Sequence, residues 1–286
     1  MVFVRKKKIS GREYHYLVAK TRVDGKEKRI ERYLGIHPPS ANDLIKYAKE
    51  FDKVKLFLKS KKDLLARLSF EYRQKMKASK DEIKVYEEEL ITRFTYNTSR
   101  IEGSSLTFAD TRMLLQEHIT PGNRPLRDVQ ETENHKKAFL LLKTHQQITR
   151  KLIMDLHKTL KAGVSDDAGI FRTAQVTVAN LVPVRADLIE QEIKNLILWN
   201  KKNQKMHTIE RVCTFHALFE RIHPFFDGNG RVGRLLLNFM LMQEGYPPVI
   251  IQNKNRRRYY AALRKADGGN ILPLMKYIVS EIEAGM

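Results

Sequence analysis

The side chains best suited to chemistry in this sequence fall within one short segment, residues 223–234. It holds a base, an acid, a glycine-framed turn and two arginines, namely His223, Asp227, Gly228, Asn229, Gly230, Arg231 and Arg234. Gly228 and Gly230 allow backbone angles that turn successive N–H groups into a concave nest. The helix expected directly after them adds a favourable field for anionic oxygens. The segment therefore predicts a polyphosphate site.

The charged side chains of the segment fit the same task. Arg231 and Arg234 are three residues apart, so on a helix both guanidinium groups can reach one anion. Asp227 supplies a hard oxygen ligand for Mg²⁺ bound between phosphates. His223 can be neutral at physiological pH and accept a proton from an attacking hydroxyl. Together they predict group transfer from a nucleoside triphosphate by in-line displacement; the alternative is a plain helix connection with surface arginines.

At these positions the sequence resembles the Fic family. The family's loop reads His-x-Phe-x-(Asp/Glu)-Gly-Asn-Gly-Arg-x-x-Arg, and every fixed position is matched by residues 223–234. The resemblance implies a protein adenylyltransferase that passes AMP from ATP to Ser, Thr or Tyr hydroxyls of a target protein and of itself. It implies His223 as base, Asp227 on Mg²⁺ and Arg234 at the γ-phosphate. Gly228, Asn229, Gly230 and Arg231 would surround the remaining phosphates, and Phe225 would anchor the loop in the core.

A second segment, residues 98–103, resembles the inhibitory pattern (Ser/Thr)-x-x-x-Glu-(Gly/Asn) of many Fic proteins. The resemblance implies autoinhibition within the chain. A carboxylate of Glu102 that reaches Arg234 would take the place of the γ-phosphate and leave ATP misaligned. Two alternatives stay open: Glu102 is an ordinary surface glutamate, or it positions water for the removal of AMP.

Two further segments agree with the resemblance. The β-branched run at 173–185 is predicted to form a short β-hairpin, similar to the family's flap, whose edge pairs with the target segment. Tyr259 or Tyr260 would lie near the adenosine, although aromatic residues at helical spacing are more often core. His216 is expected to be a hydrogen-bonded core histidine.

The elements that must position these residues are mostly helical. The fold class predicted is mainly α: a Fic-type helical bundle with a short β-hairpin flap, a small N-terminal β-hairpin and a helical extension. Three regions are expected: a basic hairpin appendage at 1–37, a helical region at 38–94, and the Fic domain at 95–286. Strands around Asp24-Gly25 define the hairpin, and the capping pattern that starts at Ser79 begins the helix that carries residues 98–103.

Composition limits the function only coarsely. The chain has 286 residues, of which 42% are hydrophobic, and a formal net charge of +20, with eleven Lys or Arg against four Asp or Glu in residues 1–35. The charge fits a basic helix surface, attraction to polyphosphate, or nucleic-acid contact through 1–35 by a DNA-linked regulator. Transfer of another nucleotide or of phosphate is the nearest alternative activity. The single cysteine, Cys213, is expected in the core.

The sequence also carries expectations about where the protein is located and whether it forms a dimer. The basic start without an apolar leader, and the lack of any apolar run near eighteen residues, predict a cytoplasmic protein without membrane contact. A homodimer is expected only by resemblance to the Fic family.

Overall fold

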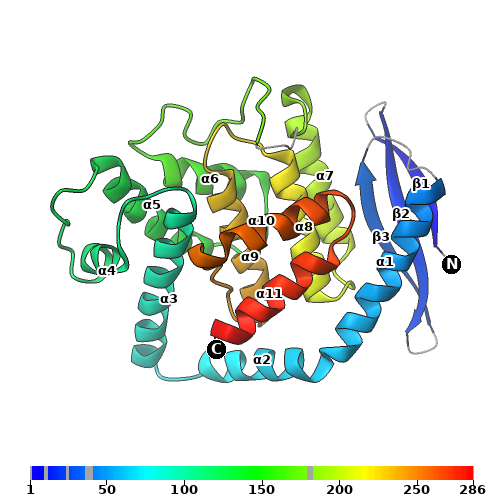
Figure 1. Cartoon of the computed structure of the whole chain (residues 1–286), viewed down its shortest axis with the longest axis horizontal. Coiled ribbons are helices and arrows are strands. Elements are labelled where there is room, and N and C mark those ends of the chain that lie inside the picture. Colours follow the sequence, from blue (N-terminus) through cyan, green and yellow to red (C-terminus); the bar gives the residue numbers. More distant parts are fainter. Residues whose placement is uncertain (1, 10–11, 24–25, 36–40, 179–182, 286) are drawn as a thin grey trace.

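The computed structural model describes residues 2–9, 12–23, 26–35, 41–178 and 183–285. Helices dominate it, as the sequence predicts (Figure 1). They are α1 (Ala41–Ser60), α2 (Lys62–Lys75), α3 (Lys80–Ile101), α4 (Phe108–Gln116), α5 (Leu126–Leu142), α6 (Arg150–Lys161), α7 (Ile189–Lys202), α8 (Thr208–Ile222), α9 (Asn229–Gln243), α10 (Arg256–Asp267) and α11 (Leu272–Gly285), with 3₁₀ turns at Ala186–Leu188 and Asn253–Asn255.

The N-terminal unit is a three-stranded antiparallel sheet in the order β1-β2-β3. Strands β2 (Arg12–Val23) and β3 (Lys26–Gly35) are the predicted hairpin, although its turn at Asp24-Gly25 lies outside the described residues. Strand β1 (Val2–Ile9) was not predicted, because its lysine run hides the alternation of a strand. Tyr16 and Val18 of β2 are buried, which ties the sheet to the rest of the protein.

The helical extension, α1 and α2, runs around the outside of the bundle, and α3 then joins the bundle. In Figure 1, α1 descends beside the sheet, α2 crosses below the bundle and α3 rises on the far side. Glu50 of α1 accepts a hydrogen bond from the Leu272 backbone N–H at 3.1 Å, at the start of α11. Ser69 of α2 donates to the Gly245 carbonyl at 2.9 Å, just after α9. These contacts hold the extension against the C-terminal half of the chain.

Capping residues set the starts of the two helices that precede the bundle core. Ser79 begins α3 with a reciprocal capping box, in which its hydroxyl accepts from the Glu82 N–H and Glu82 accepts from the Ser79 N–H. Thr107 and Asp110 form the same arrangement at α4. The cap at Ser79 was predicted, and it fixes where α3 starts; Glu102 directly follows the last residue of α3.

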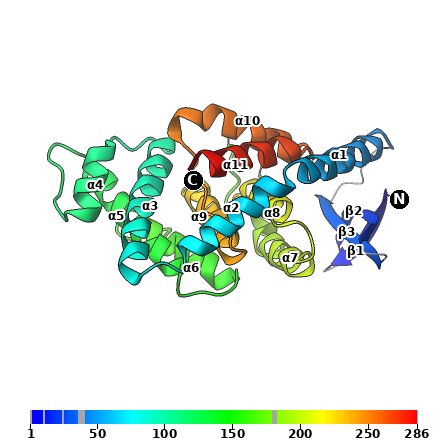
Figure 2. The same ribbon diagram turned by 90° about the horizontal axis from the view of Figure 1, so that it is seen from below.

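The core forms around α8 and α9, which lie in the middle of the bundle in both ribbon views (Figures 1 and 2). Most of their apolar side chains are buried, and the fully buried ones include Val212, Cys213, Phe219, Leu235, Leu236 and Leu237. The connection between the two helices is the segment 223–228. The segment 223–228 is therefore held at both ends by deeply buried helices. Cys213 lies in the core, as the sequence predicts.

The predicted flap lies between Arg172 and the 3₁₀ turn at Ala186–Leu188. Its two described arms, 173–178 and 183–185, approach each other, because Gln175 donates a hydrogen bond to the Pro183 carbonyl at 3.1 Å. One bridge residue, Val178, marks strand pairing on the first arm. The tip, residues 179–182, lies outside the described residues.

No helix in the described part of the chain is both long and apolar enough to span a membrane.

Candidate functional site

His223 is held in a conformation that exposes one imidazole nitrogen for chemistry. It follows the last residue of α8 with φ 50° and ψ 62°, in the left-handed region that few residues other than glycine adopt. Its Nδ1 lies 3.3 Å from the Glu220 carbonyl, which can only accept, so Nδ1 carries the proton. Burial lowers the pKa of His223 below its ordinary value. The neutral ring therefore offers Nε2 as a proton acceptor, as a general base requires.

Asn229 closes the loop on itself. Its Oδ1 accepts from the Phe225 N–H at 2.9 Å, and its Nδ2 donates to the Phe225 carbonyl at 2.8 Å. Phe225 is fully buried, as expected for an anchor. Because the amide of Asn229 is committed to Phe225, the part of Asn229 left for a phosphate is its backbone N–H.

A buried histidine from α6 supports the loop from the other side. The ring of His157 stacks on Phe225 with centroids 3.7 Å apart. Its Nδ1 accepts from the Gly169 N–H at 2.9 Å, so its Nε2 carries the proton and donates to the Asp227 carbonyl at 3.0 Å. Burial lowers the pKa of His157 to about 4, which keeps this arrangement neutral. Nothing in the sequence singles out His157 beyond its place on an amphipathic helix.

The two glycines of the turn meet different requirements. Gly228 has φ +82° at the start of α9, a backbone conformation that L side chains rarely adopt. At Gly230 a methyl group would lie 2.7 Å from Oε1 of Glu102 and 2.9 Å from an Arg234 nitrogen. The Glu102 carboxylate thus sits directly over the turn that was predicted to hold phosphate.

Arg234 joins this turn to the end of α3. Its Nε donates to the Thr98 hydroxyl at 2.6 Å and its Nη2 to Glu102 Oε1 at 2.5 Å. The Arg234 side chain is 1% exposed and Glu102 is 29% exposed. Burial opposes the charge of Arg234, but the Glu102 carboxylate together with Tyr259 and Tyr260 raises the arginine's pKa. The ion pair predicted between Glu102 and Arg234 is present, and Thr98 is an additional partner that the sequence did not indicate.

Arg231 faces a separate cluster of charges. Its Nη1 pairs with Glu131 of α5 at 2.7 Å and its Nη2 with Asp227 at 3.3 Å. Lys161 of α6 bridges the same two carboxylates, 3.0 Å from Glu131 and 2.7 Å from Asp227. In this state Arg231 and Arg234 therefore hold different anions, although the sequence places both within reach of one.

Asp227 remains suited to a magnesium ion shared with a nucleotide. Burial opposes its ionisation, but the hydrogen bond from Lys161 and the charge of Arg231 lower its pKa to about 2. Its side chain is 51% exposed, so an ion can approach it. No group of three or more His, Cys, Asp or Glu that could enclose a metal occurs among the described residues. The side chains thus fit Mg²⁺ as one carboxylate ligand completed by phosphate oxygens and water.

The two tyrosines predicted near the adenosine have different surroundings. Tyr259 is fully buried, and its hydroxyl donates to His216 Nε2 at 2.7 Å, while His216 Nδ1 donates to the Gly233 carbonyl at 3.1 Å. The core role predicted for His216 is confirmed, and Tyr259 shares it. Tyr260 is 37% exposed, so of the two tyrosines it is the one whose ring is open to a ligand.

Arg172 ties the flap to the catalytic loop. Its guanidinium donates to the His223 carbonyl at 2.8 Å and to the Ala174 carbonyl at 2.9 Å, and also to the carbonyl of Val184 on the other arm. Its backbone N–H donates to the Pro224 carbonyl at 2.9 Å. Arg172 is 2% exposed. One buried side chain thus fixes both arms of the flap relative to His223.

Replacing Arg172 with methionine is expected to destabilise the protein by about 2–4 kcal/mol, because several buried carbonyls lose a charged donor at once. Denaturant unfolding measures the change. The matched control is Arg185→Met, since Arg185 lies on the second flap arm and is 72% exposed. Equal stability of the two variants would show that Arg172 does not hold the loop.

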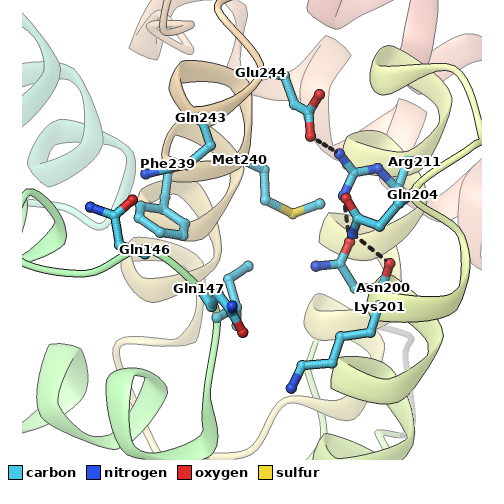
Figure 3. A pocket seen from close by; sticks show the side chains of 11 residues that line it. Gln146, Gln147, Asn200, Lys201, Gln204, Arg211, Phe239, Met240, Gln243 and Glu244 are labelled. Carbon is cyan, nitrogen blue, oxygen red and sulfur yellow. Dashed lines mark hydrogen bonds and ion pairs between the residues drawn. The ribbon is translucent and has the colours of Figure 1, made fainter.

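A separate pocket lies at the far end of α9 (Figure 3). It has a volume of about 460 Å³, and five of its eleven lining residues carry amide side chains, which lie around Arg211. Arg211 donates to Asn200 at 2.8 Å and pairs with Glu244, just beyond α9. The catalytic loop precedes the other end of this 15-residue helix, about 20 Å away at 1.5 Å per residue. The pocket is therefore separate from the segment 223–234.

The chain is similar in sequence to known Fic proteins. Residues 147–241 match the model of the Fic/DOC family. Protein adenylyltransferase fic-1 of Caenorhabditis elegans is 32% identical over 202 residues, which cover 68% of this chain and 40% of that protein. Protein adenylyltransferase Fic of Drosophila ananassae is 33% identical over 190 residues, or 64% of this chain and 38% of that protein. The aligned region is thus well under half of these relatives.

Solved structures show the same fold. A structure of residues 134–508 of C. elegans Fic-1 superposes with a TM-score of 0.74 at 27% identity, covering 87% of this chain and 77% of that one. A Fic-domain protein from Bacteroides thetaiotaomicron superposes with a TM-score of 0.71 at 24% identity, covering 76% and 93%. These matches reach beyond residues 147–241 and include helices that precede them.

Proposed function

We propose that this chain, whose residues 147–241 belong to the Fic/DOC family, transfers AMP from ATP to hydroxyl groups of a target protein and of itself. The observation that carries the proposal is the loop 223–234. It places a neutral His223 before a glycine turn at the N-terminus of α9, with Arg234 buried behind the turn. The naming of similar proteins as protein adenylyltransferases supports the choice of AMP.

The loop supplies each element that the transfer needs. His223 Nε2 takes the proton from the target hydroxyl as its oxygen attacks the α-phosphorus, and the bond to the bridging oxygen breaks so that pyrophosphate leaves. The N–H groups around Gly228 and Gly230 hold phosphate oxygens, and Arg234 takes the γ-phosphate. Mg²⁺, held by Asp227 and the phosphates, would neutralise developing charge. We propose that the flap aligns the target segment by strand pairing, as Arg172 fixes its arms.

The test is labelling of the Glu102→Gly variant with each nucleoside triphosphate, carrying the label in the α- or the γ-phosphate. Transfer of AMP incorporates α-label from ATP and no γ-label. Incorporation of γ-label would show that the protein transfers phosphate, as a kinase does. Preference for UTP would show that it transfers UMP and not AMP. Tandem mass spectrometry of the product then gives the acceptor side chain. Light scattering during purification tests the proposed homodimer.

The pH dependence follows from His223. Its pKa lies below the ordinary value of 6.5 because burial disfavours the charged ring. A base must be unprotonated, so we expect kcat/KM of the Glu102→Gly variant to rise with pH through a midpoint below 6.5 and then to level off. The rate of α-label transfer across pH measures this. A midpoint well above 6.5 would mean that another group limits the reaction.

Removal of AMP is the second use open to the same site. Glu102 lies over the turn, where a carboxylate can orient water toward a bound AMP-protein bond. Incubating a protein modified by the Glu102→Gly variant with wild-type enzyme separates the two uses. Release of AMP by wild type, and not by a Glu102→Ala variant, would assign Glu102 a role in hydrolysis.

Nucleic-acid contact is a second candidate function for the N-terminal sheet. Lys6 and Lys8 alternate on β1 and are both exposed, so they lie on the same face. If this face binds duplex DNA, a Lys6→Ala, Lys8→Ala double variant should reduce the slope of log affinity against log salt by about two. Fluorescence anisotropy with labelled duplex measures it. An unchanged slope would remove this face from consideration.

A further inference from the structure

Lys161, the last residue of α6, is a charged group in contact with the loop, and the proposed mechanism does not use it. Its side chain is 3% exposed, yet its ammonium lies 2.7 Å from Oδ2 of Asp227, the proposed magnesium ligand. A second contact of 3.0 Å joins it to Glu131. Burying an ammonium group costs several kcal/mol unless partners compensate it. Two carboxylates compensate this one, so the lysine is built into the site.

The charges around Lys161 do not balance. Arg231 and Arg127 also contact Asp227, at 3.3 and 3.6 Å, and both pair with Glu131. Three cations thus meet two carboxylates, which leaves one positive charge beside the phosphate turn before any ligand binds. Such a surplus favours a polyanion.

The shape of the Lys161 side chain determines how it contacts Asp227. Lys161 has a compact ammonium group with three donors, of which Glu131 and Asp227 take two in the described part of the chain. It acts on Asp227 Oδ2, the same oxygen that Arg231 contacts. A magnesium ion that binds Asp227 therefore has to share this carboxylate with a fixed ammonium group.

We propose that Lys161 is a resident cation of the nucleotide site, which shares Asp227 with Mg²⁺ and supplies part of the positive charge that the phosphates meet. The inference rests on the proposed function, because it assumes that the nucleotide's phosphates lie over the turn at Gly228 and Gly230. Two consequences follow. The protein binds ATP measurably without divalent metal, and Mg²⁺ improves that binding less than it does after Lys161 is neutralised.

The experiment measures ATP affinity by calorimetry, in EDTA and over a range of Mg²⁺ concentrations, with all variants made in the Glu102→Gly background. Lys161→Met removes the ammonium and keeps most of the apolar stem. Lys158→Met is the matched control, since Lys158 is an exposed lysine on the same helix. Lys161→Arg keeps the charge.

We expect Lys161→Met to weaken metal-free ATP binding about tenfold, and Mg²⁺ to restore most of the loss. Lys158→Met should stay close to the parent, and Lys161→Arg should recover only part of the metal-free affinity, because it keeps the charge but not the compact ammonium group. Thermal melting of each variant shows whether the fold is kept. A purely structural lysine would lower the melting temperature of Lys161→Met without changing the ratio of metal-free to Mg²⁺ affinity.

Two results would overturn the proposal: equal metal-free affinity of Lys161→Met and Lys158→Met, or no detectable ATP binding by the parent in EDTA. The second needs no Lys161 variant, so it decides the matter even if Lys161→Met fails to fold. Failure of the proposed function looks different, because the parent would then bind no ATP even with Mg²⁺.

Discussion

Replacing Glu102 with glycine is expected to raise AMP transfer from Mg·ATP by about 10–100-fold. The carboxylate pairs with Arg234 at 2.5 Å and lies over the Gly230 turn, where it would take both the partner and the space of the γ-phosphate in the proposed binding mode. A charge-assisted hydrogen bond contributes about 1.5–3 kcal/mol, which corresponds to that range of rates once the competition is removed. Incorporation of α-labelled ATP into the protein itself measures the effect.

A matched control separates loss of the carboxylate from loss of a helix-terminal side chain. Glu117 ends α4 as Glu102 ends α3, with a similar backbone conformation (φ −95° and −86°), and it is exposed. Glu117→Gly should leave labelling at the wild-type level, and Glu102→Gln should raise it partway. Equal labelling by wild type and Glu102→Gly would refute the inhibitory role of Glu102.

Replacing His223 with alanine in the Glu102→Gly background is expected to reduce AMP transfer by about 10²–10⁴-fold, the usual contribution of a general base. The Glu220 carbonyl holds the proton on Nδ1 and leaves Nε2 to act on the hydroxyl. ATP binding should change little, because the phosphates are held by the turn and by Arg234. The measurement pairs labelling rates with ATP affinity from calorimetry.

The unusual backbone of His223 calls for its own control. Its φ of 50° is nearly matched by the exposed His118, with φ 58°. His118→Ala should therefore carry the same backbone strain and keep full activity. His223→Asn tolerates the left-handed conformation and removes the base, so it should be as inactive as His223→Ala. Activity retained in His223→Asn would show that the imidazole is not the base.

The catalytic loop was predictable because its parts are contiguous in the sequence. A turn with two glycines, followed by a helix, forms one local unit, so the nest, His223 and Asp227 could be assigned without knowing the fold. The pairing of Glu102 with Arg234 required knowledge of a family pattern, since 132 residues separate them.

The supporting side chains could not be predicted, because their roles depend on which helices pack together. In the sequence, Lys161 and His157 are only two polar residues on an amphipathic helix. Their contacts with the loop depend on the packing of α6 against it. From the sequence alone, Glu131 looks like a surface glutamate, and only the packing of α5 shows that it pairs with Arg231. The divergence of Arg231 and Arg234 has the same cause, since spacing along a helix shows what two side chains can reach and not which partners compete for them.

A crystal structure of the Glu102→Gly variant with Mg²⁺ and a non-hydrolysable ATP analogue would show directly where the nucleotide binds. We expect the phosphates over the turn at Gly228 and Gly230, the γ-phosphate on Arg234, and the α-phosphorus facing Nε2 of His223. A nucleotide bound elsewhere, or one whose γ-phosphorus faces His223, would contradict this expectation.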